Sequence, residues 1–179
     1  KRHHIDLEQG LRVRDTTLAL FNQISHSGLL KREKRLLSWA AQLHEIGLMI
    51  AHSQYHLHGG YLLENMDLPG FSRQEQGALS IMVRLHRRKY LSDRIDENVY
   101  VRSEALSIMT RLLRLGVLLN RGRLPIEMPV LQLKLETVKV MKLEISTAWL
   151  DDHPLTAADL DQEVELLDAA DHSLQIIRT

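Results

Sequence analysis

The spacing of the apolar residues changes at Pro125 in this chain of 179 residues. Before Pro125, apolar side chains recur every three or four residues, as Leu112 and Leu115 do, which is the period of a helix with one buried face. After it, apolar and polar residues alternate, as around Leu131 and Leu133, which is typical of a half-buried strand. The sequence therefore predicts a mainly α fold, with a helical unit followed by a small unit of mixed helix and strand.

The helical unit covers residues 1–123 and is expected to contain five helical segments. They are residues 7–24, residues 33–50, a short helix over Tyr61–Asn65 opened by Gly59 and Gly60, a helix that ends near Lys89, and residues 98–120. Ser72 and Glu75 precede the fourth segment and have the spacing of a capping box.

The second unit covers residues 124–179 and is expected to have the element order ββαβ. Its expected elements are strands over residues 130–136 and 138–146, a helix over residues 153–171 capped by Thr156 and Asp159, and a last strand over residues 172–178. The link between the first two strands is short, which favours an antiparallel hairpin.

The composition excludes several classes of protein. The chain has no cysteine, which excludes disulfides and thiolate metal sites and fits a cytoplasmic protein. It has no run of about 18 apolar residues that would span a membrane, and no signal peptide. Because the first residue is Lys1 rather than Met, we expect the sequence to be a fragment of a longer protein.

The formal net charge of zero hides a strong asymmetry. Residues 1–123 carry 19 basic and 12 acidic side chains, a net charge of +7, whereas residues 124–179 carry 4 and 11, a net charge of −7. Such a split indicates either two units with different partners or two units that attract each other.

Histidines gather in residues 40–63, AAQLHEIGLMIAHSQYHLHGGYLL, which hold four of the ten in the chain. His44 stands beside Glu45 in an apolar setting. Imidazole and carboxylate groups are common metal ligands, but buried polar pairs at helix junctions are more often simply hydrogen-bonded. We expect the second arrangement for His44 and Glu45.

Four motifs follow one another in a recognisable order: HEIG, HLHGGYLLENMDLPGFSRQEQ, VRLHRRKY and LLRLGVLLNRGR. Over roughly residues 3–123 this order resembles the helical HD-type domain of the exopolyphosphatase/guanosine pentaphosphate phosphohydrolase family. The strands and helix that follow resemble the last domain of the longer members. The resemblance implies an HD-like helical domain over residues 1–123 and a small α+β domain over residues 124–179.

The HD pattern uses a first His, a His-Asp pair and a late Asp to hold a divalent metal, whose bound water attacks a phosphoester. The matching positions in this sequence form a degenerate set: Gln9, His44, Glu45 and Val117. Hard divalent ions need carboxylates, and valine offers no lone pair. His3 and His4 could compensate for Gln9, but nothing replaces Val117, so we expect no metal site.

A basic face is expected to bind phosphate groups instead. His58 and His86 match histidines that the family keeps, and guanidinium groups bind phosphate oxygens bidentately. The expected phosphate-binding residues are His58, Arg84, His86, Arg87, Arg88, Arg114 and Arg121. A plain solvated face with satisfied histidines is the open alternative.

The resemblance implies that phosphoanhydride hydrolysis takes place in an N-terminal pair of actin-like domains. The nine glycines here form neither a Walker motif nor a GxGxxG motif, and we assign no catalytic residue. We therefore expect the C-terminal accessory region of an exopolyphosphatase-type hydrolase. Its expected partners are polyphosphate or another polyanionic phosphate ligand, the catalytic module and a second copy in a homodimer. We expect no cofactor in this fragment, and Mg²⁺ only in the full-length enzyme.

Two other functions fit parts of the sequence. A metal-dependent HD phosphohydrolase acting on nucleotides would use His44, but Val117 speaks against it. A nucleic-acid or partner-binding helical module would need aromatic stacking platforms on the basic face, where Tyr90 and Tyr100 are the nearest. The residues leave polyphosphate and guanosine pentaphosphate open as substrates.

Overall fold

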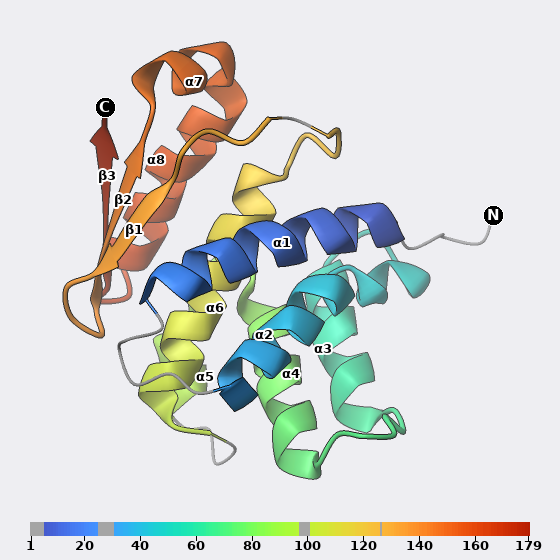
Figure 1. Ribbon diagram of the computed structural model, residues 1–179. Coiled ribbons are helices and arrows are strands. Elements are labelled where there is room, and N and C mark those ends of the chain that lie inside the picture. The colour runs from blue at the N-terminus through green and yellow to red at the C-terminus, as the bar shows by residue number, and fades with distance from the viewer. Residues whose placement is uncertain (1–5, 25–30, 97–100, 126) are drawn as a thin grey trace.

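A computed structural model describes residues 6–24, 31–96, 101–125 and 127–179 (Figure 1). The helical part contains α1 (Leu7–Ile24), α2 (Lys31–Leu43), the 3-10 helix η1 (Ile46–Met49), α3 (Tyr55–Asn65), α4 (Arg73–Leu85), α5 (Ser92–Asp96) and α6 (Ser103–Leu119). The C-terminal part contains β1 (Gln132–Leu135), β2 (Val140–Ile145), α7 (Thr147–Asp152), α8 (Pro154–Asp168) and β3 (Ser173–Arg178). The fold is mainly α with a small sheet, as the sequence predicts.

Helix α6 forms the centre of the helical part. It packs against α1, α2 and α4, and every residue from Ala105 to Gly116 is buried. The buried stretch includes the polar residues Ser107, Arg111 and Arg114, whose donors must find partners inside the protein. Those partners connect α6 to the rest of the molecule, as described below.

Two predicted helices differ in their ends. The helix expected over residues 33–50 ends at Leu43, and η1 continues the chain in a tighter path. Helix α3 begins at Tyr55 rather than at Tyr61, so Gly59 and Gly60 lie inside it. Both differences have one cause: η1 packs backbone to backbone against α3, and only glycines allow that approach.

The capping box at the start of α4 is confirmed. The Glu75 amide donates to Ser72 Oγ (3.2 Å), and the Ser72 amide donates to Glu75 Oε2 (2.8 Å). The helix ends at Leu85 rather than near Lys89. Three residues further on, Arg88 takes a φ of 64°, a left-handed conformation that an α-helix does not contain.

Part of the segment predicted as a helix over residues 98–120 falls on residues 97–100, which lie outside the described residues, as do His3, His4 and Tyr100. The described helix α6 begins at Ser103, and the short helix α5 precedes it. Among the described residues, no helix combines the length and the apolarity needed to cross a membrane.

The C-terminal part has the predicted ββαβ order, with the short helix α7 added before α8. Strands β1 and β2 form an antiparallel hairpin in which Leu133 faces Leu143, and β3 pairs with β2 in parallel. Figure 1 shows α8 against one face of this sheet, to the upper left of the helical part. The predicted caps were wrong: α8 begins at Pro154 with His153 as its N-cap, because proline suits the first helical position.

Several contacts join the two parts. The Gln23 side chain of α1 donates to the Leu131 carbonyl (3.1 Å) and accepts from the Leu133 amide (2.7 Å), so it covers the free edge of β1. The buried Arg111 guanidinium donates to the carbonyls of Val138 and Lys139 in the hairpin turn. The buried apolar side chains of both parts form one cluster, and a domain boundary after residue 123 stays a prediction.

Candidate functional site

One cavity of about 600 Å³ lies between the helical part and α8. Its walls come from α1, α3, α6 and α8 and from the segments that follow α2 and α4. It brings together the four positions matched to the HD pattern: Gln9, His44, Glu45 and Val117. It also collects basic side chains at its rim: Arg87, Arg88, Lys89, Arg121 and Arg123.

His44 is buried and neutral. Its Nδ1–H donates to the Ala41 carbonyl at 2.7 Å, which fixes the tautomer and leaves Nε2 unprotonated. Burial lowers the pKa of His44 below its usual 6.5, against the opposing effect of the Glu45 carboxylate. The distance from Nε2 to Glu45 Oε1 is 3.9 Å, so the expected hydrogen bond between His44 and Glu45 is not formed.

Glu45 is paired with Arg123 rather than with His44. Its Oε1 accepts from the Arg123 guanidinium, which also lies 3.6 Å from Asp6. Its Oε2 is buried and has no hydrogen-bond partner among the described residues. Arg123 is half exposed and Glu45 is buried, and both side chains line the cavity.

The remaining two HD positions cannot serve a metal ion. The Gln9 amide donates to the Asn120 carbonyl (2.8 Å) and accepts from Arg12 (3.0 Å), so both of its ends are used. Val117 presents only methyl groups. No cluster of three histidine or acidic side chains within the described ranges has metal-binding geometry. The residues present therefore do not fit the metal of the HD pattern, and we derive no step through one.

We expect the purified protein to retain no stoichiometric Mn, Fe, Ni or Zn after dialysis, because only His44 and Glu45 of the four positions offer a suitable donor. Elemental analysis of the wild type and of His44→Ala measures this directly. One equivalent of metal held by the wild type and lost in His44→Ala would show that the site still works.

Two further histidines near the cavity, His86 and His56, contribute little positive charge. His86 donates from Nδ1 to the Val83 carbonyl (2.6 Å), and burial lowers its pKa well below 6.5. Burial, followed by the nearby Arg87, lowers the pKa of His56 to about 4. His58 is half buried on α3 and does not line the cavity. The expectation that His86 binds phosphate as a cation is therefore not supported at neutral pH.

Three of the expected arginines are already paired. Arg114 is 2% exposed and forms a bidentate ion pair with Glu163 of α8. Arg121 pairs with Asp159 at the cavity rim. Arg84 pairs with Glu64 (2.9 Å) and lines a neighbouring cavity, not this one.

Arg87, Arg88 and Lys89 form what we call the cationic segment. None of the three forms an ion pair with an acidic side chain in the part of the chain that the structure describes. Arg88 and Lys89 are exposed, and the Arg87 guanidinium lies 4.8 Å from the centre of the Tyr55 ring, in a cation–π contact. Arg87 and Arg88 also line two neighbouring cavities of about 530 and 620 Å³. Three cavities therefore border the cationic segment.

Sequence reasoning missed Tyr55 and Glu163. Tyr55 carries no signal of its own, because its role depends on the contact with Arg87. Glu163 did carry one: it stands three residues after Leu160 and four before Leu167, on the buried face of α8. An acid on an apolar face indicates a buried basic partner.

The profile of one protein family matches residues 1–164, and its description is Ppx/GppA phosphatase, domain III. The chain belongs to the Ppx/GppA phosphatase family. The resemblance found in the sequence motifs is thereby confirmed.

Curated relatives of this chain carry the name guanosine-5'-triphosphate,3'-diphosphate pyrophosphatase. One from Pseudoalteromonas translucida is 35% identical over 166 residues, covering 90% of this chain and 33% of its own length. One from Aeromonas hydrophila is 31% identical, covering 92% and 33%. One from Vibrio atlanticus is 38% identical over 128 residues, covering 72% and 25%. The chain spans about a third of the length of the first two.

Proposed function

We propose that this chain is the C-terminal accessory region of a hydrolase that cleaves phosphoanhydride bonds, and that it binds the phosphate chain of the substrate. Catalysis belongs to an actin-like N-terminal module, which is a proposed partner together with a second copy of the chain. No residue of this chain is proposed as catalytic. The relatives' name favours a guanosine 5'-triphosphate 3'-diphosphate substrate for the whole protein, and polyphosphate offers the same chemistry.

The observation that supports phosphate binding is the cationic segment. Guanidinium and ammonium groups without an acidic partner are free to donate to phosphate oxygens, and arginine does so bidentately. Because Arg87 and Arg88 border three cavities, a long polyanion can pass over them in an extended path. A longer phosphate chain engages more cations at once and should bind more tightly than triphosphate.

The set of residues proposed to bind phosphate therefore differs from the set expected from the sequence. Arg87 and Arg88 are kept, and Lys89 joins them. Arg121 is exposed, and surface ion pairs such as that with Asp159 are weak, so Arg121 can still turn to a ligand. Arg114 is given a structural role instead.

Replacing both Arg87 and Arg88 by alanine is expected to weaken binding of polyphosphate of tens of units by at least about tenfold. A hydrogen bond to a charged group contributes about 1.5–3 kcal/mol, and about 1.4 kcal/mol is a factor of ten. Calorimetric titration at two salt concentrations measures the effect. Binding by the wild type should weaken as salt rises, because exposed charges are screened.

The matched control is the double replacement of Lys139 and Lys142 by alanine. It also removes two positive charges, but from the C-terminal part, where Lys139 pairs with Asp171 and Lys142 with Glu136. We expect a loss of less than about threefold, since both charges are already paired with acidic side chains. A wild type that does not bind polyphosphate, or a control that loses more affinity than the Arg87/Arg88 variant, would refute the proposed site.

A further inference from the structure

The cationic segment is held at both ends by one face of α6. Arg114 donates to the Leu85 carbonyl (2.5 Å) and to the Arg88 carbonyl (2.8 Å). One residue past the segment, the Tyr90 hydroxyl lies 3.0 Å from Ser107 Oγ. Ser107 and Arg114 are seven residues apart, which is two turns, so they project from the same side of the helix.

Each of these two anchors is completed by a side chain of the C-terminal part. Glu163 of α8 accepts from Arg114 at 2.5 and 2.8 Å. His172, just before β3, lies with its Nε2 3.2 Å from Ser107 Oγ. The acidic C-terminal part is therefore connected to the cationic segment indirectly, through Arg114 and Ser107 of α6.

The hydrogen bonds at the second anchor have one consistent direction. His172 Nδ1–H donates to the Ala170 carbonyl at 2.8 Å, because a carbonyl can only accept. Its Nε2 then accepts from the Ser107 hydroxyl, and Ser107 Oγ accepts from Tyr90. The Tyr90 and His172 rings also touch edge to face, with centres 5.2 Å apart. Each proton in this series of three hydrogen bonds, from Tyr90 to the Ala170 carbonyl, therefore has one acceptor.

We propose that the C-terminal part positions the cationic segment for phosphate binding, with His172 acting through Ser107 as a positioning residue. The inference rests on the proposed function, because it assigns a purpose to the same cations. It also gives the acidic part of the chain, which contains none of the three cations of the segment, a role in binding a polyanion.

Protonation of His172 would reverse the chain of hydrogen bonds. Nε2 would become a donor, and a hydroxyl proton of Ser107 or of the buried Tyr90 would lose its acceptor. The charged groups around His172 are Arg111 of α6, Lys139 of the hairpin turn and Asp171 beside it. Burial is the main effect that lowers the pKa of His172 below 6.5, and Arg111 and Lys139 add to it.

The sign of the pH effect follows from this direction. A histidine whose pKa is lowered in the folded protein contributes stability that is present above the unfolded value of about 6.5. That contribution is lost as the pH falls through the folded value. The ordered position of the cationic segment should therefore weaken as the pH falls through the pKa of His172 in the folded protein, which lies below 6.5.

The test compares three variants of this chain in titrations with polyphosphate from pH 5 to pH 8. His172→Phe keeps a ring but removes the acceptor, and we expect polyphosphate to bind roughly threefold to tenfold more weakly at pH 7.5, as for one lost hydrogen bond. Ser107→Ala should lose a similar factor. His172→Gln places an amide oxygen near the Nε2 position, so it should bind like the wild type at pH 7.5. The ratio of the wild-type affinity to the His172→Gln affinity should decrease when the pH is lowered from 6.5 to 5.

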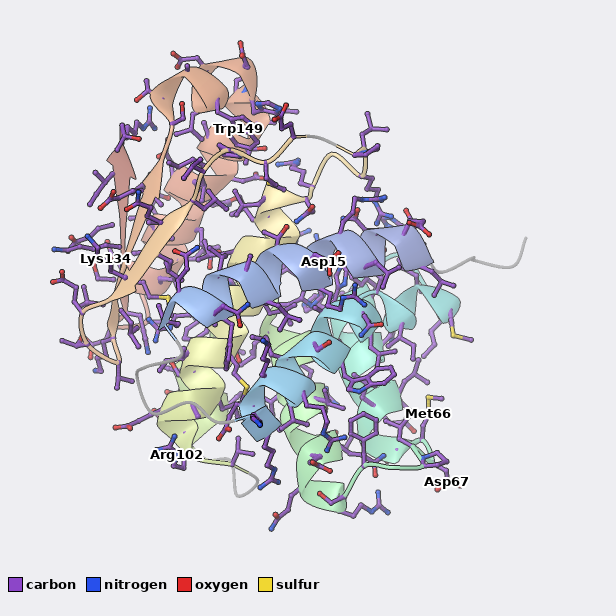
Figure 2. All side chains as sticks on the ribbon, in the orientation of Figure 1. Asp15, Met66, Asp67, Arg102, Lys134 and Trp149 are labelled. Atoms are coloured by element: carbon purple, nitrogen blue, oxygen red, sulfur yellow. The ribbon has the colours of Figure 1, made fainter. Side chains whose placement is uncertain are left out.

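The control variant is His153→Phe, which replaces the other half-buried histidine of the C-terminal part. His153 stacks on Trp149 with ring centres 4.0 Å apart, and Figure 2 shows Trp149 near the top of the molecule, by α7. This site has no bond to the cationic segment, so binding should be unchanged. Amide hydrogen exchange over residues 85–91 gives a second measurement that needs no ligand, and His172→Phe should make it faster while His153→Phe does not.

The outcomes separate the two proposals. Failure of the wild type to bind polyphosphate refutes the proposed function, and the exchange rates of residues 85–91 then still decide whether His172 holds the segment. Normal binding by the wild type, with equal affinity and equal exchange in His172→Phe, refutes the positioning role alone. A His172→Gln variant as weak as His172→Phe would also refute it.

Discussion

Replacing Glu163 by alanine is expected to lower the free energy of unfolding by about 3–5 kcal/mol, because the Arg114 charge would be left in a buried site without a carboxylate. Arg114 is 2% exposed and Glu163 is 5% exposed, so solvent screens this ion pair little. The carbonyls of Leu85 and Arg88 still accept from Arg114, but a carbonyl does not neutralise a charge. Urea unfolding followed by circular dichroism measures the change.

The matched control for this prediction is Asp159→Ala, which removes the partner of Arg121 at the rim of the same cavity. That pair is partly exposed, and we expect a loss of no more than about 1 kcal/mol. The double variant Arg114→Met/Glu163→Leu should recover most of the stability, since apolar residues of similar size often replace a buried ion pair without loss. The double variant should nevertheless bind polyphosphate more weakly than the wild type, because the Leu85 and Arg88 carbonyls would lose their donor. A cost below about 1 kcal/mol for Glu163→Ala would show that this pair does not hold the two parts together.

The charge split between the two parts has a physical meaning that the sequence left open. Of the two interpretations, different partners or mutual attraction, the contacts favour attraction. Glu163 and Asp159 of the acidic part pair with Arg114 and Arg121 of the basic part. Arg114 and Arg121 are paired in this way, whereas Arg87, Arg88 and Lys89 beside the same cavity have no acidic partner within the described residues.

The sequence predicts elements well where a single local pattern decides them. The capping box at Ser72 and Glu75 and the alternation around Leu133 depend on neighbours within a few residues, and both are confirmed. The errors fall where distant contacts decide the backbone. Helix α2 stops at Leu43 and α3 starts at Tyr55, because the backbone of η1 packs against α3, and no local pattern encodes that approach.

The candidate site shows the same division. The resemblance placed Gln9, His44, Glu45 and Val117 in one pocket, and the structure brings these four together. It could not tell which basic residues are free, because that depends on acids far along the chain. Arg114 lies 49 residues from its partner Glu163, and a count of positive charges treats it like Arg88.

Replacing Gly47 by alanine is expected to destabilise the protein by about 3 kcal/mol or more, the upper range for overpacking a tight site. A Cβ at Gly47 would lie 1.9 Å from the Tyr55 carbonyl oxygen and 2.4 Å from the Gly59 nitrogen. Both are backbone atoms, so no side-chain rotation relieves the clash and η1 must move away from α3.

Gly122→Ala is the control, since a Cβ there meets nothing within 4 Å and should change stability by less than about 0.5 kcal/mol. Because η1 follows Glu45 directly and Tyr55 supports Arg87, the shift should also weaken polyphosphate binding. Equal unfolding free energies for Gly47→Ala and Gly122→Ala would show that the close approach of η1 and α3 is not required.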